Sequence, residues 1–312
     1  MSTTLPPSGN SRRVAAGLVW GGWVALVVIT ALGFTAQWIP AADLINDLRP
    51  LAALVALALF VVAVGLRDWR LIRPTAALAL LYAGMLLLPW ARAADRASVP
   101  PALRLVTVDL GTDSQRFDEV ADFILGAGAD IVLLQQVSCS AAERLIPKLK
   151  PTFANAFVSA EGCAGQALLA KRPWSAVGQT ITAARKPLLI SASFQWGNAA
   201  FTLTGASLSG ALSPNAQADE FARLRAQLAS QGPAQIVAGA FNLTPFAWRL
   251  AQLQNAGFGQ HATYLATWPA RWPLLLLDNV LSTEGIASVR VAIGPPLGTE
   301  HRPLIADIAF VK

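Results

Sequence analysis

The stretch Asp-Ile-Val-Leu-Leu-Gln-Gln-Val at residues 130–137 decides the fold of the larger part of this chain. Its uninterrupted run of Ile, Val and Leu is typical of a strand buried on both faces. Apolar residues at helical spacing precede it over residues 115–126 and follow it over residues 141–149, and residues 103–108 predict another strand. Strands and helices that alternate in this way predict an α/β or α+β layered domain.

The same alternation continues to the C-terminus. Strands are expected at residues 167–169, 188–194, 200–207, 235–238, 274–282, 287–292 and 304–310. A helix is expected over residues 215–230, with Pro214 in its first turn and Gly232 just beyond its end, and a short helix is expected after Pro245. Residues 103–312 therefore predict one domain of ordinary size, preceded by a polar hinge at residues 96–102.

Upstream of the hinge the composition changes. The 312 residues are 54% hydrophobic and 13% charged, whereas an ordinary soluble domain is roughly 25% charged. The apolar excess lies in three stretches, residues 14–36, 50–66 and 74–91. Each meets the roughly 17 to 25 residues that a helix needs to cross a bilayer. Residues 1–95 therefore predict a membrane anchor of three helices, the second being short enough to leave a buried core helix as its alternative.

Basic residues in the short flanks predict the orientation of this anchor. Arg12 and Arg13 precede the first span and three arginines follow the second, whereas the loop between these spans carries Asp43 and Asp47 against Arg49. We expect a cytoplasmic N-terminus and a C-terminal domain outside the cytoplasm, in the periplasm or cell exterior of a bacterium. A twin-arginine export signal is the alternative for Arg12-Arg13, but two further spans follow and no small-residue cleavage site is evident.

The cysteines and the net charge bear on three other features: a disulfide, a zinc site and a nucleic-acid-binding surface. Cys139 and Cys163 predict one disulfide closing a surface loop, with two free thiols as the alternative, and four ligands at zinc spacing are absent. The net charge of +6 does not point to nucleic acid, because much of it flanks the spans. Residues 100–312 also show no run of Lys and Arg interleaved with aromatic residues.

Polar residues directly follow strand-like runs at six places, where active sites of layered folds gather. They are Asp109, Gln136, Ser207, residues 239–242, the pair Asp278-Asn279, and residues 298–303.

Four motifs in this set resemble the endonuclease/exonuclease/phosphatase (DNase I-like) superfamily over residues 103–310. They are residues 130–137, Gly-Ala-Phe-Asn at 239–242, Leu-Asp-Asn-Val-Leu at 277–281 and Gly-Thr-Glu-His-Arg-Pro-Leu at 298–304, with a weaker likeness at 165–173. The resemblance implies an α+β, four-layer α/β/β/α sandwich. It also implies a divalent-metal site, usually Mg²⁺, that hydrolyses phosphoesters in nucleic acids, phosphoinositides, sphingomyelin or related substrates.

The resemblance also assigns roles to individual positions. Family positions are retained at Asn242, Asp278 and His301, the candidate catalytic residues. The family's metal-binding Glu is replaced by Gln136, the Asp of Gly-Asp-Phe-Asn by Ala240, and the His after the middle strand by Ser207. The remaining altered positions are Asp109, which stands for an Asn, Glu300, which stands for an Asp, and Asn279.

These replacements predict an impaired or inactive site that acts as a binding module. A neutral amide at Gln136 removes a charge from a site that holds Mg²⁺ by one or two carboxylates. A methyl group at Ala240 cannot accept a proton or orient a water molecule, and losing one acid–base group typically costs roughly 10² to 10⁴ in rate.

An active enzyme is the alternative hypothesis. Asp109 with Gln136 resembles the family's Asn and Glu exchanged between neighbouring strands, so a shifted metal held by Asp109 and Glu300 would keep the local charge. His301 backed by Asp278 would then stabilise a phosphoryl oxygen, although the pair is equally consistent with a plain buried hydrogen bond.

A third hypothesis makes the helices functional and the domain a scaffold, but the absence of charges inside the spans speaks against transport. The isolated His261 is interpreted as structural. Expected partners are the membrane and a phosphate-bearing lipid, extracellular nucleic acid or another envelope protein.

Overall fold

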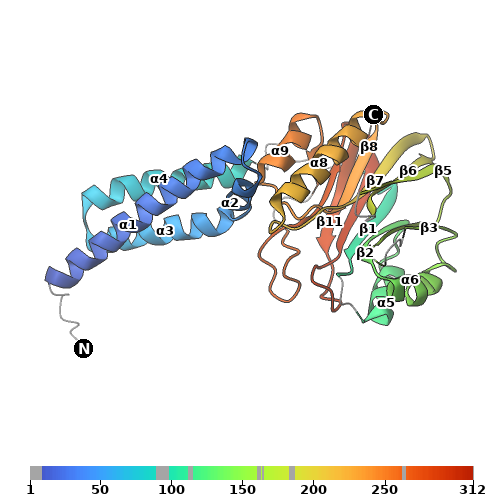
Figure 1. Ribbon diagram of the computed structural model, residues 1–312, viewed down its shortest axis with the longest axis horizontal. Helices are drawn as coiled ribbons and strands as arrows, with labels where there is room; N and C mark the ends of the chain where they lie inside the picture. Colours follow the sequence, from blue (N-terminus) through green and yellow to red (C-terminus); the bar gives the residue numbers. More distant parts are fainter. Residues whose placement is uncertain are drawn as a thin grey trace. The chain divides into compact units, whose positions relative to one another are not determined.

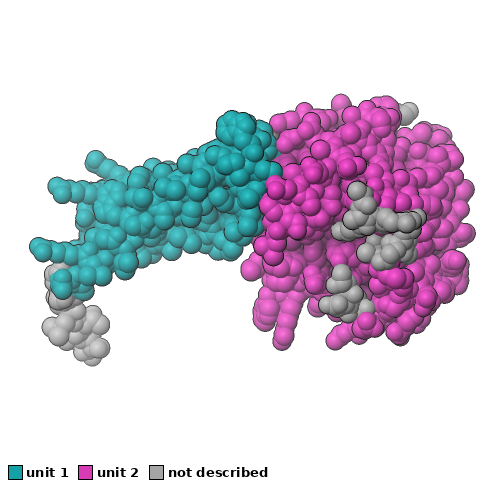
Figure 2. All heavy atoms as spheres, viewed as in Figure 1, with its two compact units in different colours: residues 1–91, 246–248 teal, residues 92–245, 249–312 magenta. Residues whose placement is uncertain are grey.

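This computed structural model describes residues 9–88, 98–111, 115–159, 163, 165–182, 187–261 and 265–311. The chain divides into two compact units (Figure 2), of which the first contains residues 1–91 and 246–248 and the second residues 92–245 and 249–312. Of the expected hinge at residues 96–102, the part within the described residues, 98–102, has no helix or strand.

The first unit is helical. Its long helices are α1 (Gly9–Gly33), α3 (Arg49–Leu66) and α4 (Trp69–Leu87), joined through η1 (Phe34–Gln37), η2 (Pro40–Ala42) and α2 (Asp43–Asp47). Three helical segments, Asn10–Gln37, Arg49–Leu66 and Trp69–Leu87, are long and apolar enough to cross a membrane. They pack through small buried clusters such as Leu26, Ala56, Leu78 and Tyr82. The number of expected spans is confirmed as three candidates.

The third span differs from its expected position at residues 74–91. Helix α4 starts at Trp69 because the Asp68 side chain caps it by accepting a hydrogen bond from the backbone N–H of Arg70 (2.9 Å), so Pro74 lies inside the helix. Arg70 and Arg73 therefore lie in the first turns of α4, not in a loop. Residues 89–91 of the expected span lie outside the described residues.

The second unit contains two six-stranded sheets (Figure 1). The first sheet has the order β11-β12-β1-β2-β4-β3 and the second the order β5-β6-β7-β8-β10-β9. The strands of the first sheet are β1 (Leu103–Asp109), β2 (Ile131–Val137), β3 (Asn155–Ser159), β4 (Gly165–Ala170), β11 (Ile286–Ile293) and β12 (Leu304–Phe310). Those of the second are β5 (Trp174–Ile181), β6 (Pro187–Trp196), β7 (Ala199–Ser207), β8 (Gln235–Ala240), β9 (Gly259–Gln260) and β10 (Asp278–Ser282).

Helices cover the outer faces of both sheets. They are α5 (Phe117–Gly126), α6 (Cys139–Arg144), α7 (Ile146–Leu149), α8 (Pro214–Ala229) and α9 (Trp248–Asn255). Strand β2 shows why its sequence is apolar throughout. Leu133 packs in the core between the sheets, while Val132 and Leu134 pack in the core under α5 to α7. The expected four-layer sandwich is confirmed.

Several elements differ from expectation for local reasons. The helix expected at residues 141–149 is broken into α6 and α7, because Pro147 near the start of α7 cannot continue the helical hydrogen bonding. Strands β3 and β5 were not expected, because they are edge strands whose side chains are mostly half-buried or exposed. The strand expected at residues 274–282 begins only at Asp278, because Leu275 pairs with Trp268 in a separate turn.

Cys139 and Cys163 form the expected disulfide, and the alternative of two free thiols is wrong. The bond joins the start of α6 to the segment before β4.

Candidate functional site

Five strands bring their termini to one end of the sandwich, and four of them carry a polar residue there. In the first sheet, Asp109 at the end of β1 pairs in register with Gln135 of β2. In the second sheet, Ser207 at the end of β7 pairs with Ala240 at the end of β8, which pairs with Asp278 at the start of β10. The pairing thus aligns positions that are 33 and 38 residues apart in sequence.

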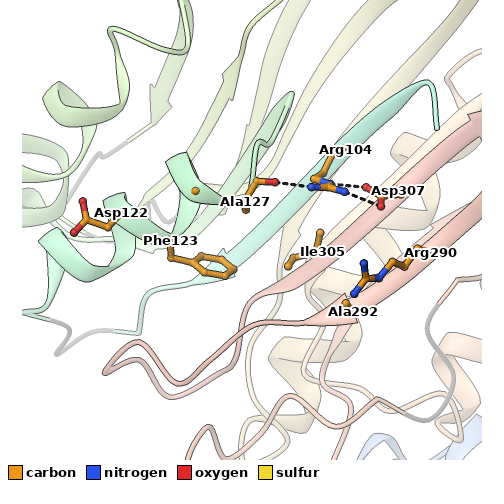
Figure 3. A pocket seen from close by; sticks show the side chains of 9 residues that line it. Arg104, Asp122, Phe123, Ala127, Arg290, Ala292, Ile305 and Asp307 are labelled. Carbon is orange, nitrogen blue, oxygen red and sulfur yellow. Dashed lines mark hydrogen bonds and ion pairs between the residues drawn. The ribbon is translucent and has the colours of Figure 1, made fainter. Parts of the chain in front are cut away.

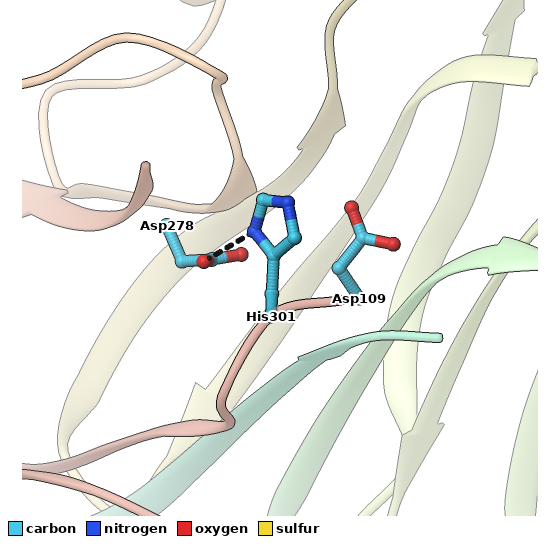
Figure 4. A group of neighbouring side chains, drawn as sticks. All are labelled: Asp109, Asp278 and His301. Atoms are coloured by element: carbon cyan, nitrogen blue, oxygen red, sulfur yellow. Dashed lines mark hydrogen bonds and ion pairs between the residues drawn. The ribbon is translucent and has the colours of Figure 1, made fainter. Parts of the chain in front are cut away.

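Asp109, Asp278 and His301 form the centre of the site (Figure 4). Their ligand-capable atoms all lie within 4.8 Å of one another, and the three residues are 1%, 2% and 4% exposed. His301 Nδ1 lies 2.7 Å from Asp278 Oδ2. This bond fixes the ring and leaves Nε2 on its opposite edge. The expected pairing of His301 with Asp278 is therefore present in the structure.

Thr267 supports this pair from the loop before β10. Its Oγ1 accepts a hydrogen bond from the backbone N–H of Asp278 (3.3 Å), and its carbonyl oxygen accepts one from the backbone N–H of Arg302 (2.8 Å). Thr267 is completely buried. One residue thereby sets the relative positions of the Asp278 strand end and the His301 loop. No sequence signal marks Thr267, because it is an isolated hydroxyl residue in an irregular segment.

Asp109 is held by two donors. Gln136 Nε2 donates to Asp109 Oδ2 (2.8 Å), and the backbone N–H of Gly111 donates to Oδ1 (2.9 Å). Gln136 reaches Asp109 because a bulge interrupts the β2–β4 register there and Gln136 adopts a left-handed backbone with φ of 54°. The altered pair that the sequence pointed to, Asp109 with Gln136, is thus a hydrogen-bonded pair.

Burial and charge shift two pKa values in this group. Burial raises the pKa of Asp109, opposed by the positive charge of His301 and reinforced by the negative charge of Asp278. Burial alone would lower the pKa of His301, but Asp278, with smaller contributions from Asp109 and Glu300, raises it to about 9. At neutral pH the imidazole is therefore protonated and lies between two carboxyl groups.

Two of the positions that the resemblance marks as altered, Ala240 and Ser207, provide no acid or base. Ala240 is 0% exposed and Ser207 3% exposed, so a methyl group and a hydroxyl occupy the strand ends beside Asp278. The preceding Gly239 must be glycine. A Cβ there would lie 2.2 Å from the carbonyl oxygen of Ala206, and φ is +131°.

Asn242 and Asn279 both act as loop anchors in the structure. Asn242 Nδ2 donates to the carbonyl oxygen of Leu208 (2.8 Å), which ties the loop after β8 to the loop after β7. Asn279 Nδ2 donates to the carbonyl oxygen of Leu243 (2.9 Å), and its Oδ1 accepts from Gln260 (2.6 Å). Since neighbouring residues on a strand face opposite ways, Asn279 lies away from the group containing Asp278.

Glu300 lies beside the Asp109 turn. A Cβ on Gly111 would be 3.5 Å from Glu300 Cγ, and Gly111 is the residue whose N–H binds Asp109. The exposed Glu300 and the buried Asp109 thus both lie beside the turn at Gly111. Carboxylate oxygens suit Mg²⁺, which keeps several waters when few protein ligands are available. The carboxylates of Asp109 and Glu300 therefore fit a weakly held hard cation, and Asp109, Asp278 and His301 offer a second set of ligand atoms within 4.8 Å of one another.

A separate hollow of about 360 Å³ lies beside α5 and the strands β1, β11 and β12 (Figure 3). The Arg104 guanidinium on its wall makes two bonds to the Asp307 carboxylate (2.5 and 2.9 Å) and one to the carbonyl oxygen of Ala127 (2.7 Å). The charge on this wall is neutralised within the domain, and none of the predicted site residues lines the hollow.

The sequence profile of the Endonuclease/Exonuclease/phosphatase family matches residues 108–301. This chain belongs to that family. The match spans most of the second unit and includes every predicted site residue. A search among curated proteins finds no match.

Several solved structures share the fold. An endonuclease/exonuclease/phosphatase family protein from Bacteroides thetaiotaomicron is similar with a TM-score of 0.58 and 12% identity, covering 67% of this chain and 98% of that one. A humanized TDP2 from D. rerio gives 0.55 and 14%, covering 66% and 98%. Sphingomyelinase C from Streptomyces griseocarneus gives 0.51 and 16%, covering 67% and 99%. At these identities the likeness concerns the fold alone.

Proposed function

We propose that this protein is a membrane-anchored member of the family whose site binds a phosphate-bearing ligand but hydrolyses it poorly or not at all. The observation that carries the proposal is Ala240, a buried methyl group in register with Asp278 where the resemblance places the family's Asp. Gln136 adds to it, because its amide is occupied as a donor to Asp109 and contributes no charge.

The residues present suit binding. Asp278 holds the protonated His301 by Nδ1, which leaves the Nε2–H free to donate to a phosphoryl oxygen. The imidazolium supplies a fixed positive charge in a buried place, where such a charge attracts an anion more strongly than it would in water.

The full chain, purified in detergent with Mg²⁺ or Mn²⁺, is expected to show no more hydrolysis of bis-p-nitrophenyl phosphate or plasmid DNA than its His301→Ala variant. The physical reason is that Ala240, at the position where the resemblance places the family's Asp, has a methyl group that cannot activate water. Initial rates of p-nitrophenol release and plasmid nicking measure this. Metal-dependent turnover that disappears in His301→Ala would contradict the proposal.

An active Mg²⁺-dependent phosphodiesterase, phosphatase or nuclease is the second candidate, favoured by the approach of Glu300 to the Asp109 turn. Those two residues would hold the ion, and the bound ion would polarise the phosphoryl group. Asp278 would keep the His301 ring oriented towards that group.

On this second candidate, Mg²⁺ affinity of the full chain should fall at least about tenfold in Asp109→Asn, because one of two carboxylate ligands is lost. Isothermal titration calorimetry measures it. Asp219→Asn, a change of the same chemistry at an exposed position on α8, is the matched control. Equal affinities in all three proteins would leave no place for an Asp109-held ion.

We also propose that the domain lies outside the cytoplasm, on the bias of Arg12 and Arg13, which lie in the first turns of α1 at the N-terminal end of the first candidate span. Its ligand would then be a phosphate-bearing lipid, extracellular nucleic acid or another envelope protein. An alkaline phosphatase reporter fused after Lys312 in a bacterial host is expected to be active, since that enzyme needs an oxidising compartment, as the Cys139–Cys163 disulfide does. A green fluorescent protein fusion at the same position is the converse control, and fluorescence with no phosphatase activity would reverse the orientation.

A further inference from the structure

The loop of residues 268–275, Trp-Pro-Ala-Arg-Trp-Pro-Leu-Leu, presents large apolar side chains to solvent. We call it the tryptophan loop. Trp272 is 72% exposed, Leu274 61% and Trp268 36%. Among the described residues of the second unit, the three most exposed large apolar side chains are Leu212, Trp272 and Leu274. Exposed apolar residues gathered in this way mark an interaction surface.

The tryptophan loop is ordered. Its ends are closed by Trp268 and Leu275, each of which donates its backbone N–H to the other's carbonyl oxygen (2.9 Å), and Trp272 N–H donates to the carbonyl oxygen of Pro269 (3.1 Å). Pro269 and Pro273 further restrict its backbone. The apolar tip is therefore presented in a fixed shape, so little conformational entropy is lost when it docks.

The tryptophan loop is hydrogen-bonded to both chain neighbours of His301 in the candidate site. The backbone N–H of Ala270 donates to the carbonyl oxygen of Glu300 (2.8 Å), and Arg302 Nε donates to the carbonyl oxygen of Ala270 (2.6 Å). Leu212 stands on another loop at this edge, between Ser207 at the end of β7 and the start of α8. The exposed apolar residues thus border the group of Asp109, Asp278 and His301.

The composition of the tryptophan loop matches a lipid interface. Trp is enriched where a bilayer meets water, because its ring is apolar and its N–H is polar. Arg271 lies between the two tryptophans, is exposed, and has no ion-pair or hydrogen-bond partner among the described residues. A free guanidinium beside apolar side chains suits an anionic lipid surface, with the charge at the headgroups and the rings below them.

The helical anchor of the same chain would keep the domain close to a membrane. Fifteen residues, 88–102, connect the end of α4 to the start of β1. A segment of this length spans at most about 50 Å when fully extended. If α4 crosses a bilayer, the domain can never move far from it, and the tethered loop meets lipid at a high effective concentration.

We infer that the tryptophan loop, with Leu212, docks onto an anionic lipid bilayer and holds this side of the domain, next to the site, against the headgroups. This goes beyond the proposed function and holds whether or not the site hydrolyses anything.

The test uses the full chain carrying Trp272→Cys and a nitrobenzoxadiazole label, reconstituted into vesicles of phosphatidylcholine and phosphatidylglycerol. Both native cysteines lie in the disulfide, so the label reacts only at the introduced thiol. Asn198→Cys is the matched control. Asn198 is exposed in the turn between β6 and β7, at the end of β7 opposite to Ser207. We expect blue-shifted emission and several-fold quenching by doxyl-labelled lipids at position 272, and neither at position 198.

Leu274→Cys provides a second labelling site if Trp272→Cys fails to fold. Arg271→Gln in the labelled chain should lower the ratio of docked to undocked protein about fivefold with phosphatidylglycerol present and not in pure phosphatidylcholine. Quenching that is equal at positions 198 and 272, or absent from both 272 and 274 in these protein-free vesicles, overturns the inference. The second of these results would indicate that a protein covers the loop instead.

Discussion

The triple variant Gln136→Glu, Ala240→Asp, Ser207→His is expected to raise Mg²⁺-dependent hydrolysis of bis-p-nitrophenyl phosphate at least about 10²-fold over the unmodified chain. The change returns a charged metal ligand, a carboxylate beside Asp278 and an imidazole on the neighbouring strand. One acid–base group alone is typically worth roughly 10² to 10⁴ in rate, and effects of groups that act as a unit do not add.

The matched control is the same triple variant with Ala240→Asn in place of Ala240→Asp. Asparagine has the shape of aspartate but neither its charge nor its basicity, so this control separates chemistry from the filling of space beside Ser207 and Asp278. Rates are measured on full chains of verified fold. If both triple variants fold and remain equally inactive, the pocket has diverged beyond these three side chains, which would favour the binding module strongly over a recently impaired enzyme.

Asp278→Asn is expected to destabilise the second unit by about 2 to 3 kcal/mol at pH 6, with the loss becoming small by pH 10. His301 has a folded-state pKa of about 9 against an ordinary value of 6.5. A raised pKa contributes stability that is fully present below pH 6.5 and is lost as the pH rises through 9. Asp278 makes the largest favourable contribution to that shift, so its neutral replacement removes most of it.

Pulse proteolysis of the full chain across a urea series, scored on the C-terminal fragment at each pH, measures this loss. Asp219→Asn makes the same chemical change on the exposed face of α8 and should alter stability by less than about 0.5 kcal/mol. The explanation fails if Asp278→Asn matches this control at pH 6, or if its loss is as large at pH 10 as at pH 6.

The family resemblance was recoverable from the sequence because its motifs lie in strands and the loops that directly follow or precede them. The apolar run at residues 130–137 predicts a strand buried on both faces, and in the structure each face of β2 packs in a hydrophobic core. Edge strands gave no such signal. β5 is mostly exposed or half-buried, so its composition resembles that of a loop.

Single-residue caps and breaks were also missed. The sequence predicts that the third span starts at Pro74. In the structure the Asp68 cap starts the helix at Trp69, five residues earlier. The capping hydrogen bond outweighed the usual preference of proline for the first turn. Boundaries of this kind depend on one interaction and leave little trace in the periodicity.

By itself, the sequence determined the three candidate spans, the layered fold, and which family positions are retained or replaced, because composition and strand-borne motifs are local properties. Only the tertiary structure decided that Gln136 turns through a bulge to bind Asp109, that Asn279 faces away from Asp278, and that Thr267 joins the two halves of the site. It also put the tryptophan loop beside Glu300 and Arg302, the chain neighbours of His301. These facts depend on strand register, backbone handedness and contacts between distant segments, which are set by packing of the whole domain.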